Sequence, residues 1–299
     1  MQVENKNIEL AVTFLALTLL MFFTRYFGII AMPFVLGAYL INSIANKDFS
    51  SVYLYLASIG VLTIFLGLEF MFEKLVLGLP FLLISVDLII KKLRGDKLLL
   101  VMTLTLVISI ILYLILLREI FNLNIIEIFN SMIDREIENI NSLKGEFIFD
   151  KETIVQAYQE FKKYLASTVF LFAFLSSFIA LKMPHYLMRK RGDINISEPF
   201  IEALKLKRSA FYFMLAILIA FMLSDLGFNE LIVDNISLMI YISLSIQGLS
   251  FIMFLLKIRY KRKFAANLYF VLSIFFAGFM FFVNIIFGFV DGTTKIRGV

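Results

Sequence analysis

Long, uninterrupted runs of apolar residues determine what this chain can fold into. Runs of roughly 16–25 such residues recur through the sequence, and this is the length that an α-helix needs to cross about 30 Å of hydrocarbon. No water is available there, so each run must satisfy its own backbone N–H and C=O groups as a helix. The chain is 61% hydrophobic and 17% charged, whereas soluble domains carry about 25% charged residues. The sequence therefore predicts an all-α, polytopic transmembrane helix bundle.

The runs predict about nine spans. Only Thr24-Arg25 separates the first two, so one long kinked helix is an alternative there. Glu69, Glu73 and Lys74 predict an external turn between the third and fourth. The chain divides into N-terminal transmembrane helices (1–117), an extracytoplasmic segment (118–164) and C-terminal transmembrane helices (165–299). The spans are placed at 8–23, 26–45, 52–68, 75–90, 98–117, 165–183, 208–226, 236–256 and 266–288.

Clusters of lysine and arginine predict the orientation. Three predicted loops, at 91–97, 182–208 and 257–263, are rich in cations, and all three fall on one side of a nine-span chain. The loop between the seventh and eighth spans carries acids and no cation, and it falls on the other side. Because cytoplasmic loops carry the excess of Lys and Arg, we expect a cytoplasmic N-terminus. The C-terminus then falls outside.

Residues 118–164 are the one sizeable stretch between predicted spans, and acids outnumber cations in it. Gly145 interrupts its helical periodicity, and Asp150 can cap a second helix. The pattern predicts an extracytoplasmic amphipathic helical hairpin, lying on the membrane or over the bundle. Apolar residues recur at helical spacing at Ile126, Phe129, Ile133, Ile137 and Ile140 in the first helix, and at Ile154, Tyr158, Phe161 and Leu165 in the second.

Several classes of chemistry lack their residues. There is no cysteine and there is one histidine, His185, so thiolate metal sites and imidazole clusters are excluded. No GxxxxGK[ST] phosphate loop is present. We therefore predict no enzyme activity, no metal site and no cofactor. The basic pI near 9.2 does not indicate nucleic-acid binding, because the cations lie at span ends.

A stripe of neutral polar residues is the main candidate for a binding site. Ser243, Gln247 and Ser250 are spaced i, i+4 and i+7 on the eighth predicted span, and Asn284 lies on the ninth. Amides and hydroxyls at this depth can hydrogen-bond a neutral or zwitterionic solute. They can equally hydrogen-bond a neighbouring helix. The sequence leaves both interpretations open.

Asp87 is the candidate among the charged residues, although it lies near the cytoplasmic end of its span. Lys91 is one helical turn further on and can form an ion pair with it. Asp87 is therefore either the partner of Lys91 or part of a substrate-binding site. The other deep polar groups are neutral, which disfavours a proton-driven carrier, because such carriers need ionisable groups within the membrane.

Two short segments resemble the YybS-like family of bacterial integral membrane proteins. The first runs from Arg189-Lys-Arg-Gly192 through Ile196 to Pro199-Phe200. The second is Phe287-Gly-Phe-Val-Asp291 followed by Lys295 and Arg297. The resemblance implies the bacterial cytoplasmic (inner) membrane. It also implies similarity to the substrate-binding membrane subunits of energy-coupling-factor transporters, which bind a small solute and borrow an ATPase module.

Two functional hypotheses follow. The first is a substrate-binding or transport-type subunit for a small solute that relies on a partner for energy. Its partners would be the lipid bilayer and an ATPase or coupling membrane module, or another membrane protein. The alternative is a non-transport membrane scaffold, which recruits envelope or cell-division partners through its basic loops and its acidic hairpin.

Overall fold

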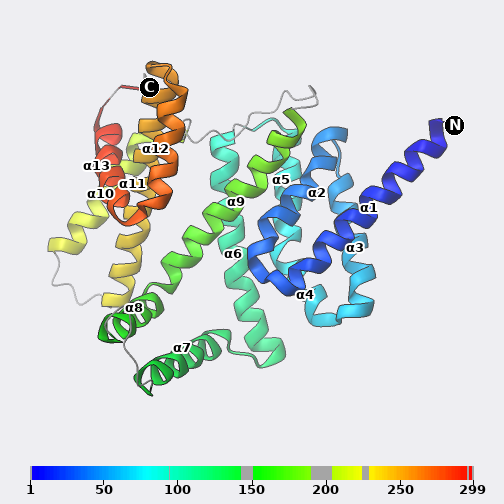
Figure 1. Ribbon diagram of the computed structural model, residues 1–299, viewed down its shortest axis with the longest axis horizontal. Coiled ribbons are helices and arrows are strands. Elements are labelled where there is room, and N and C mark those ends of the chain that lie inside the picture. The colour runs from blue at the N-terminus through cyan, green and yellow to red at the C-terminus, as the bar shows by residue number, and fades with distance from the viewer. Residues whose placement is uncertain are drawn as a thin grey trace. The chain divides into compact units, whose positions relative to one another are not determined.

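The computed structural model describes residues 2–93, 95–142, 151–189, 204–223, 229–294 and 296–297. Within these ranges every regular element is a helix (Figure 1), which confirms the predicted all-α fold. Four of the described helices are long and apolar enough to cross a membrane, and five shorter apolar helices accompany them. The four long ones are Glu9–Phe27, Lys97–Phe121, Leu165–Leu187 and Glu230–Arg259.

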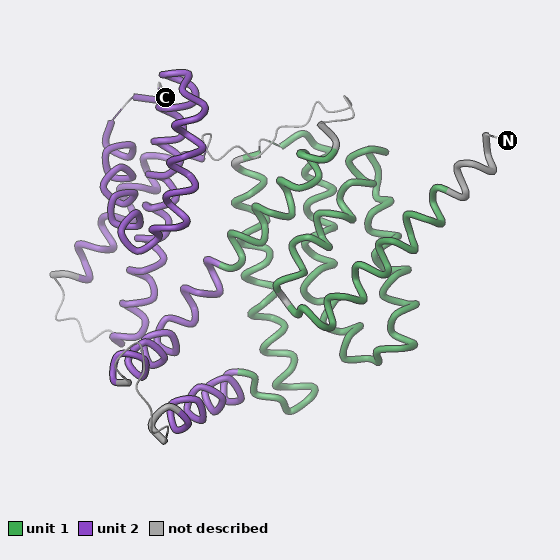
Figure 2. The backbone as a smooth tube through the Cα atoms, viewed as in Figure 1, with its two compact units in different colours: residues 1–125, 172–199 green, residues 126–171, 200–299 purple. Residues whose placement is uncertain are grey.

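The helices group into two compact units (Figure 2). Unit 1 contains residues 1–125 and 172–199, and unit 2 contains residues 126–171 and 200–299. Unit 1 holds α1 (Gln2–Phe27), η1 (Gly28–Ala31), α2 (Met32–Asn46), α3 (Ser50–Leu66), α4 (Leu68–Leu77), α5 (Leu79–Ile90), α6 (Gly95–Phe121) and most of α9 (Leu165–Arg189).

Close helix contacts hold unit 1 together. The rings of Tyr39 on α2 and Tyr55 on α3 meet edge to face, with centroids 5.1 Å apart, an arrangement that aromatic pairs favour. A Cβ on Gly37 would lie 3.0 Å from the backbone oxygen of Ala180 on α9, so the glycine favours this close approach of the two helices. The small-residue face of α9, at Ala173, Ser176, Ser177 and Ala180, is buried, as the sequence indicated.

The external turn expected at Glu69, Glu73 and Lys74 is wrong, because these residues form the helix α4. Gly67 separates α3 from α4 with φ +86°, a conformation that costs glycine little. Lys74 is buried, with an ion pair to Glu73. Its carbonyl oxygen accepts a 3.0 Å hydrogen bond from the Tyr55 hydroxyl. Glu73 compensates the charge of Lys74, and this charge was the reason for expecting a turn here.

Unit 2 begins with the predicted hairpin. α7 (Ile125–Ser142) and α8 (Lys151–Lys163) meet where the Phe129 and Phe161 rings lie 5.7 Å apart, and Lys162 forms a 3.3 Å ion pair with Asp134. The two helices confirm the prediction of a helical hairpin, while Gly145 and Asp150 lie outside the described residues. Unit 2 continues with α10 (Arg208–Leu223), α11 (Glu230–Phe254), the π-helical η3 (Leu255–Arg259), α12 (Lys263–Phe275) and α13 (Ala277–Thr293).

The hairpin leads into α9 beside the start of α11, through the buried side chain of Asn235. Its Nδ2 donates to the Lys163 carbonyl oxygen at 2.9 Å, and its Oδ1 accepts from the Ser167 backbone N–H at 3.1 Å. Lys163 also forms an ion pair with Asp234. These bonds fix the exit of α8 to the first turns of α11.

The single ninth span expected at 266–288 is also wrong. α12 ends at Phe275 and α13 begins at Ala277. The Tyr269 hydroxyl donates a 2.6 Å hydrogen bond to Asn284 Oδ1, 15 residues further along the chain. In one straight helix these residues would be about 22 Å apart, so the chain folds back at Phe276. No proline marks this reversal, and hydropathy alone cannot detect it.

The reversal makes α13 parallel to α11. Leu244 on α11 packs against Gly288 on α13, and Gln247 bonds to Asp291, so the contacts advance in step along both helices. α13 therefore ends on the side where α11 enters the basic 257–263 segment. The expectation that the chain ends opposite the basic 257–263 loop is corrected, because the reversal at Phe276 adds one change of direction after α12.

Candidate functional site

Three of the predicted polar residues, Gln247, Ser250 and Asn284, are buried where α11 faces α13. Ser243 is only partly buried, and its hydroxyl donates to the Met239 carbonyl oxygen of its own helix at 2.8 Å. The predicted stripe on α11 therefore divides into a buried part at Gln247 and Ser250 and a residue bonded within its helix.

Two glycines, Gly248 on α11 and Gly288 on α13, allow these helices to approach each other. A Cβ on Gly248 would overlap the carbonyl group of Asn284, and a Cβ on Gly288 would overlap the carbonyl group of Leu244. Any larger residue at these positions would separate the helices. Small residues at such crossings let transmembrane backbones pack closely, and here they bring the side chains of Gln247 and Asp291 within hydrogen-bonding distance.

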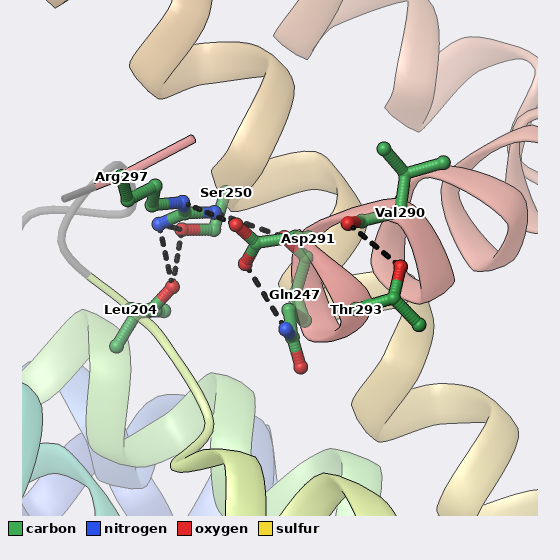
Figure 3. A network of polar contacts seen from close by, with 7 residues as sticks. All are labelled: Leu204, Gln247, Ser250, Val290, Asp291, Thr293 and Arg297. Carbon is green, nitrogen blue, oxygen red and sulfur yellow. Dashed lines mark hydrogen bonds and ion pairs between the residues drawn. The ribbon is translucent and has the colours of Figure 1, made fainter. Parts of the chain in front are cut away.

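Asp291 is the buried charge of the site, with a side chain that is 1% exposed. Its Oδ2 accepts a 3.0 Å hydrogen bond from Gln247 Nε2, and its Oδ1 lies 2.9 Å from Arg297 Nε. Figure 3 shows the carboxylate between these two partners. An isolated carboxylate would be costly to bury, so Arg297 supplies the counter-charge that makes its position tenable.

The Arg297 guanidinium is enclosed by further acceptors (Figure 3). Its Nη1 donates to the Leu204 carbonyl oxygen at 3.0 Å and to Ser250 Oγ at 3.0 Å. Its Nη2 lies 3.4 Å from the Gln247 carbonyl oxygen. Burial lowers the pKa of this guanidinium, and the charge of Asp291 acts in the opposite direction.

Two aromatic rings complete the surroundings of the guanidinium. The Arg297 Cζ atom lies 5.5 Å from the centroid of the Phe251 ring and 5.4 Å from that of Phe254. Both distances are within the range of cation–π attraction. The Arg297 side chain, which follows the last helix, is only 5% exposed. A positive group is therefore held at this place by a carboxylate, three other oxygens and two rings.

The nitrogen and the oxygen of the Gln247 amide support different interpretations of the polar stripe. Its nitrogen is bonded to the neighbouring helix through Asp291, as the helix-contact interpretation expects. Its oxygen is buried and has no hydrogen-bond partner among the residues that the structure describes, as expected of a group that awaits a ligand or water. Asn284, by contrast, has its Oδ1 bonded to Tyr269, and this contact fixes α12 to α13.

Asp87 belongs to unit 1, whereas the other predicted site residues belong to unit 2. Its carboxylate forms a 2.7 Å ion pair with Lys91, and both side chains are well exposed, 44% and 67%. This is the ion pair that the i, i+4 spacing indicated. The structure does not bring Asp87 together with Gln247, Ser250 or Asn284 within one unit.

Sequence reasoning missed Asp291 and Arg297 as site residues. Both residues belong to a segment that carries the family resemblance, and the predicted ninth span ends before them, at residue 288. The signal that could have found Asp291 was Gly288-Phe-Val-Asp291, because it places a small residue and an acid one turn apart on an apolar helix. The other segment of the resemblance, after Arg189 and up to Phe200, lies outside the described residues.

One comparison with known proteins gives a result. Residues 9–292 match the model of a family described as "Predicted membrane protein (DUF2232)". The matched range includes Gln247, Ser250 and Asp291 and stops before Arg297. No curated protein and no solved structure matches the chain.

Proposed function

The chain belongs to the DUF2232 family of membrane proteins, and on this premise we propose that it is a non-enzymatic, solute-binding subunit of the bacterial cytoplasmic membrane. It binds a small solute between α11 and α13 and relies on a partner, such as an ATPase or coupling module, for energy. The N-terminus and the basic loops lie in the cytoplasm.

The unpartnered oxygen of the Gln247 amide carries this proposal. A buried polar atom without a hydrogen bond costs about 1–3 kcal/mol, and packing alone would favour an apolar residue at this position. Gln247 is 2% exposed, so bulk water does not compensate the loss. A solute that donates a hydrogen bond to this oxygen would recover the cost.

The motifs and the buried charges of the chain support the proposed reliance on a partner for energy. The sequence has no phosphate-binding loop for ATP. The buried carboxylate of Asp291 is paired with Arg297, and an arginine remains charged at physiological pH. The Asp291 carboxylate therefore already has a fixed counter-charge within the chain. Binding, rather than ion-driven movement, is therefore the property that these groups support.

Gln247→Leu tests the proposal. The full chain is purified in mild detergent, and bound small molecules are identified by mass spectrometry. We expect the parent chain to retain a solute and Gln247→Leu to lose it, with expression unchanged. Ser243→Ala is the matched control, because its hydroxyl donates to the Met239 carbonyl oxygen of its own helix, and it should retain the solute. Equal retention by all three chains, or no solute in the parent, would count against this function.

A scaffold is the second candidate, and the surface of α7 favours it. Ile125, Ile128 and Met132 are exposed and are spaced i, i+3 and i+7, so they form one apolar strip beside the face that packs on α8. Ile128→Asp combined with Met132→Asp should leave the thermal midpoint unchanged. Under the scaffold hypothesis it should also remove proteins that co-purify with the parent chain; no change in these proteins would reject the scaffold.

A further inference from the structure

The groups around Arg297 form a receptor for a cation. We propose that the cluster of Asp291, Ser250, the Leu204 carbonyl group and the rings of Phe251 and Phe254 is a binding site for a small organic cation with a guanidinium or primary ammonium group. Arg297 is its internal occupant. This inference rests on the proposed function and specifies its ligand class.

The groups that surround the guanidinium are hydrogen-bond acceptors and aromatic rings. Toward the guanidinium the site presents a carboxylate oxygen, two backbone carbonyl oxygens and the oxygen of a hydroxyl. The Ser250 hydroxyl donates its hydrogen to the Leu204 carbonyl oxygen, so its oxygen faces the guanidinium as an acceptor. Two ring faces add their negative quadrupole. Such a set binds a desolvated cation with several N–H donors and offers nothing to an anion.

The occupant is separate from the framework that holds it. The receptor groups lie on α11, on α13 and just before α10. Arg297 lies beyond Thr293, the last residue of α13. Withdrawing its side chain requires a change after Thr293 and leaves the Gly248 and Gly288 contacts between α11 and α13 intact. The family match covers Ser250, Phe251 and Asp291 and ends at residue 292. An exchange of Arg297 for a free cation is therefore compatible with an unchanged framework.

Gln247 orients the carboxylate of the site. Its Nε2 is bonded to Asp291, and Figure 3 shows the amide oxygen on the side that points away from the carboxylate. The Arg297 nitrogens reach only the backbone oxygen of Gln247.

The test measures the thermal unfolding midpoint of the full chain in detergent. Arg297→Ala leaves Asp291 without its counter-charge, so the midpoint should fall by several degrees. Methylguanidinium chloride at about 1–20 mM, where so small a ligand is expected to bind, should raise it again along a saturating curve. Urea, which has a similar shape without the charge, and sodium chloride at equal ionic strength should not.

Two further variants make the result decisive. Arg259→Ala removes an exposed cation from η3 and should not respond to methylguanidinium. Arg297→Gln keeps hydrogen-bond donors without the charge, and it replaces Arg297→Ala if that variant does not fold. A saturating, charge-specific response supports the site. No response, or an equal response to urea or salt, overturns it.

Failure of this inference can be told apart from failure of the proposed function. Suppose that methylguanidinium does not raise the thermal midpoint of Arg297→Ala, but that this variant still retains a neutral or anionic solute from cells. The cation site is then wrong, and solute binding stands. If methylguanidinium stabilises the variant but no chain retains a solute from cells, the cation site stands and the solute-binding function is contradicted.

Discussion

Asp291 and Arg297 form an ion pair in which the two side chains are 1% and 5% exposed, and the acid lies on a helix that the arginine follows. The pair joins α13 to α11 through Gln247 and to the residue Leu204 before α10. Unit 2 therefore depends on an electrostatic contact at a point where hydropathy alone shows only an apolar helix.

The first prediction concerns the energy of this pair. Asp291→Asn leaves a buried arginine without its carboxylate, and breaking a buried pair costs about 3–5 kcal/mol. We expect a loss of this size in the free energy of unfolding, measured by denaturant titration in detergent. Asp87→Asn is the control, because its pair with Lys91 is exposed and worth only a few tenths of a kcal/mol. Similar losses for both variants would contradict the assignment.

The second prediction concerns topology. The chain has no cysteine, so single cysteines can be labelled without background. Tyr260→Cys and Ile296→Cys should react with an impermeant thiol reagent only after the cells are opened, because α11 and α13 end on the same side. Asn229→Cys, at the start of α11, should react in intact cells. Labelling of both Ile296→Cys and Asn229→Cys in intact cells would instead place the residue after α13 outside the cell.

The third prediction concerns the close packing of α11 and α13. Gly248→Ala forces a Cβ into the Asn284 carbonyl group, and overpacking of this kind costs about 1–3 kcal/mol. The thermal midpoint should fall. Gly278→Ala lies at the start of α13, where a Cβ meets nothing within 4 Å, and it should be neutral or stabilising by up to about 1 kcal/mol. A tolerated Gly248→Ala would show that the helices are further apart than described.

The fourth prediction concerns the attachment of the hairpin. Asn235→Leu removes the hydrogen bonds to Lys163 and Ser167, and each unpaired buried group costs about 1–3 kcal/mol. Hydrogen exchange should become faster in α8 and in the first turn of α9, and it should be unchanged in α13. Asn267→Ala, an exposed amide on α12, is the control. Unaltered exchange in α8 would mean that Asn235 does not hold the hairpin.

The sequence predicted features that depend on local spacing. The Asp87–Lys91 pair and the buried small face of α9 follow from helical periodicity, and the two hairpin helices follow from their apolar repeats. Lys74 and Asp291 were misjudged for one physical reason: each charge is neutralised by a partner, Glu73 or Arg297, so neither marks a water-exposed loop. For Arg297 the pairing depends on the fold after α13, and periodicity within a helix carries no information about it.

The reversal at Phe276 has a consequence for the surrounding lipid. Phe275, Phe276 and Phe279 are 80%, 60% and 73% exposed, and the Phe276 N–H and C=O are hydrogen-bonded to Leu272 and Met280. A turn with these properties is suited to acyl chains. α12 has 13 residues and α13 has 17, or about 20 and 26 Å, both shorter than the hydrocarbon thickness. Hydrophobic mismatch therefore acts on this hairpin, and acyl-chain length becomes a physical variable that bears on α13 and on the carboxylate near its end.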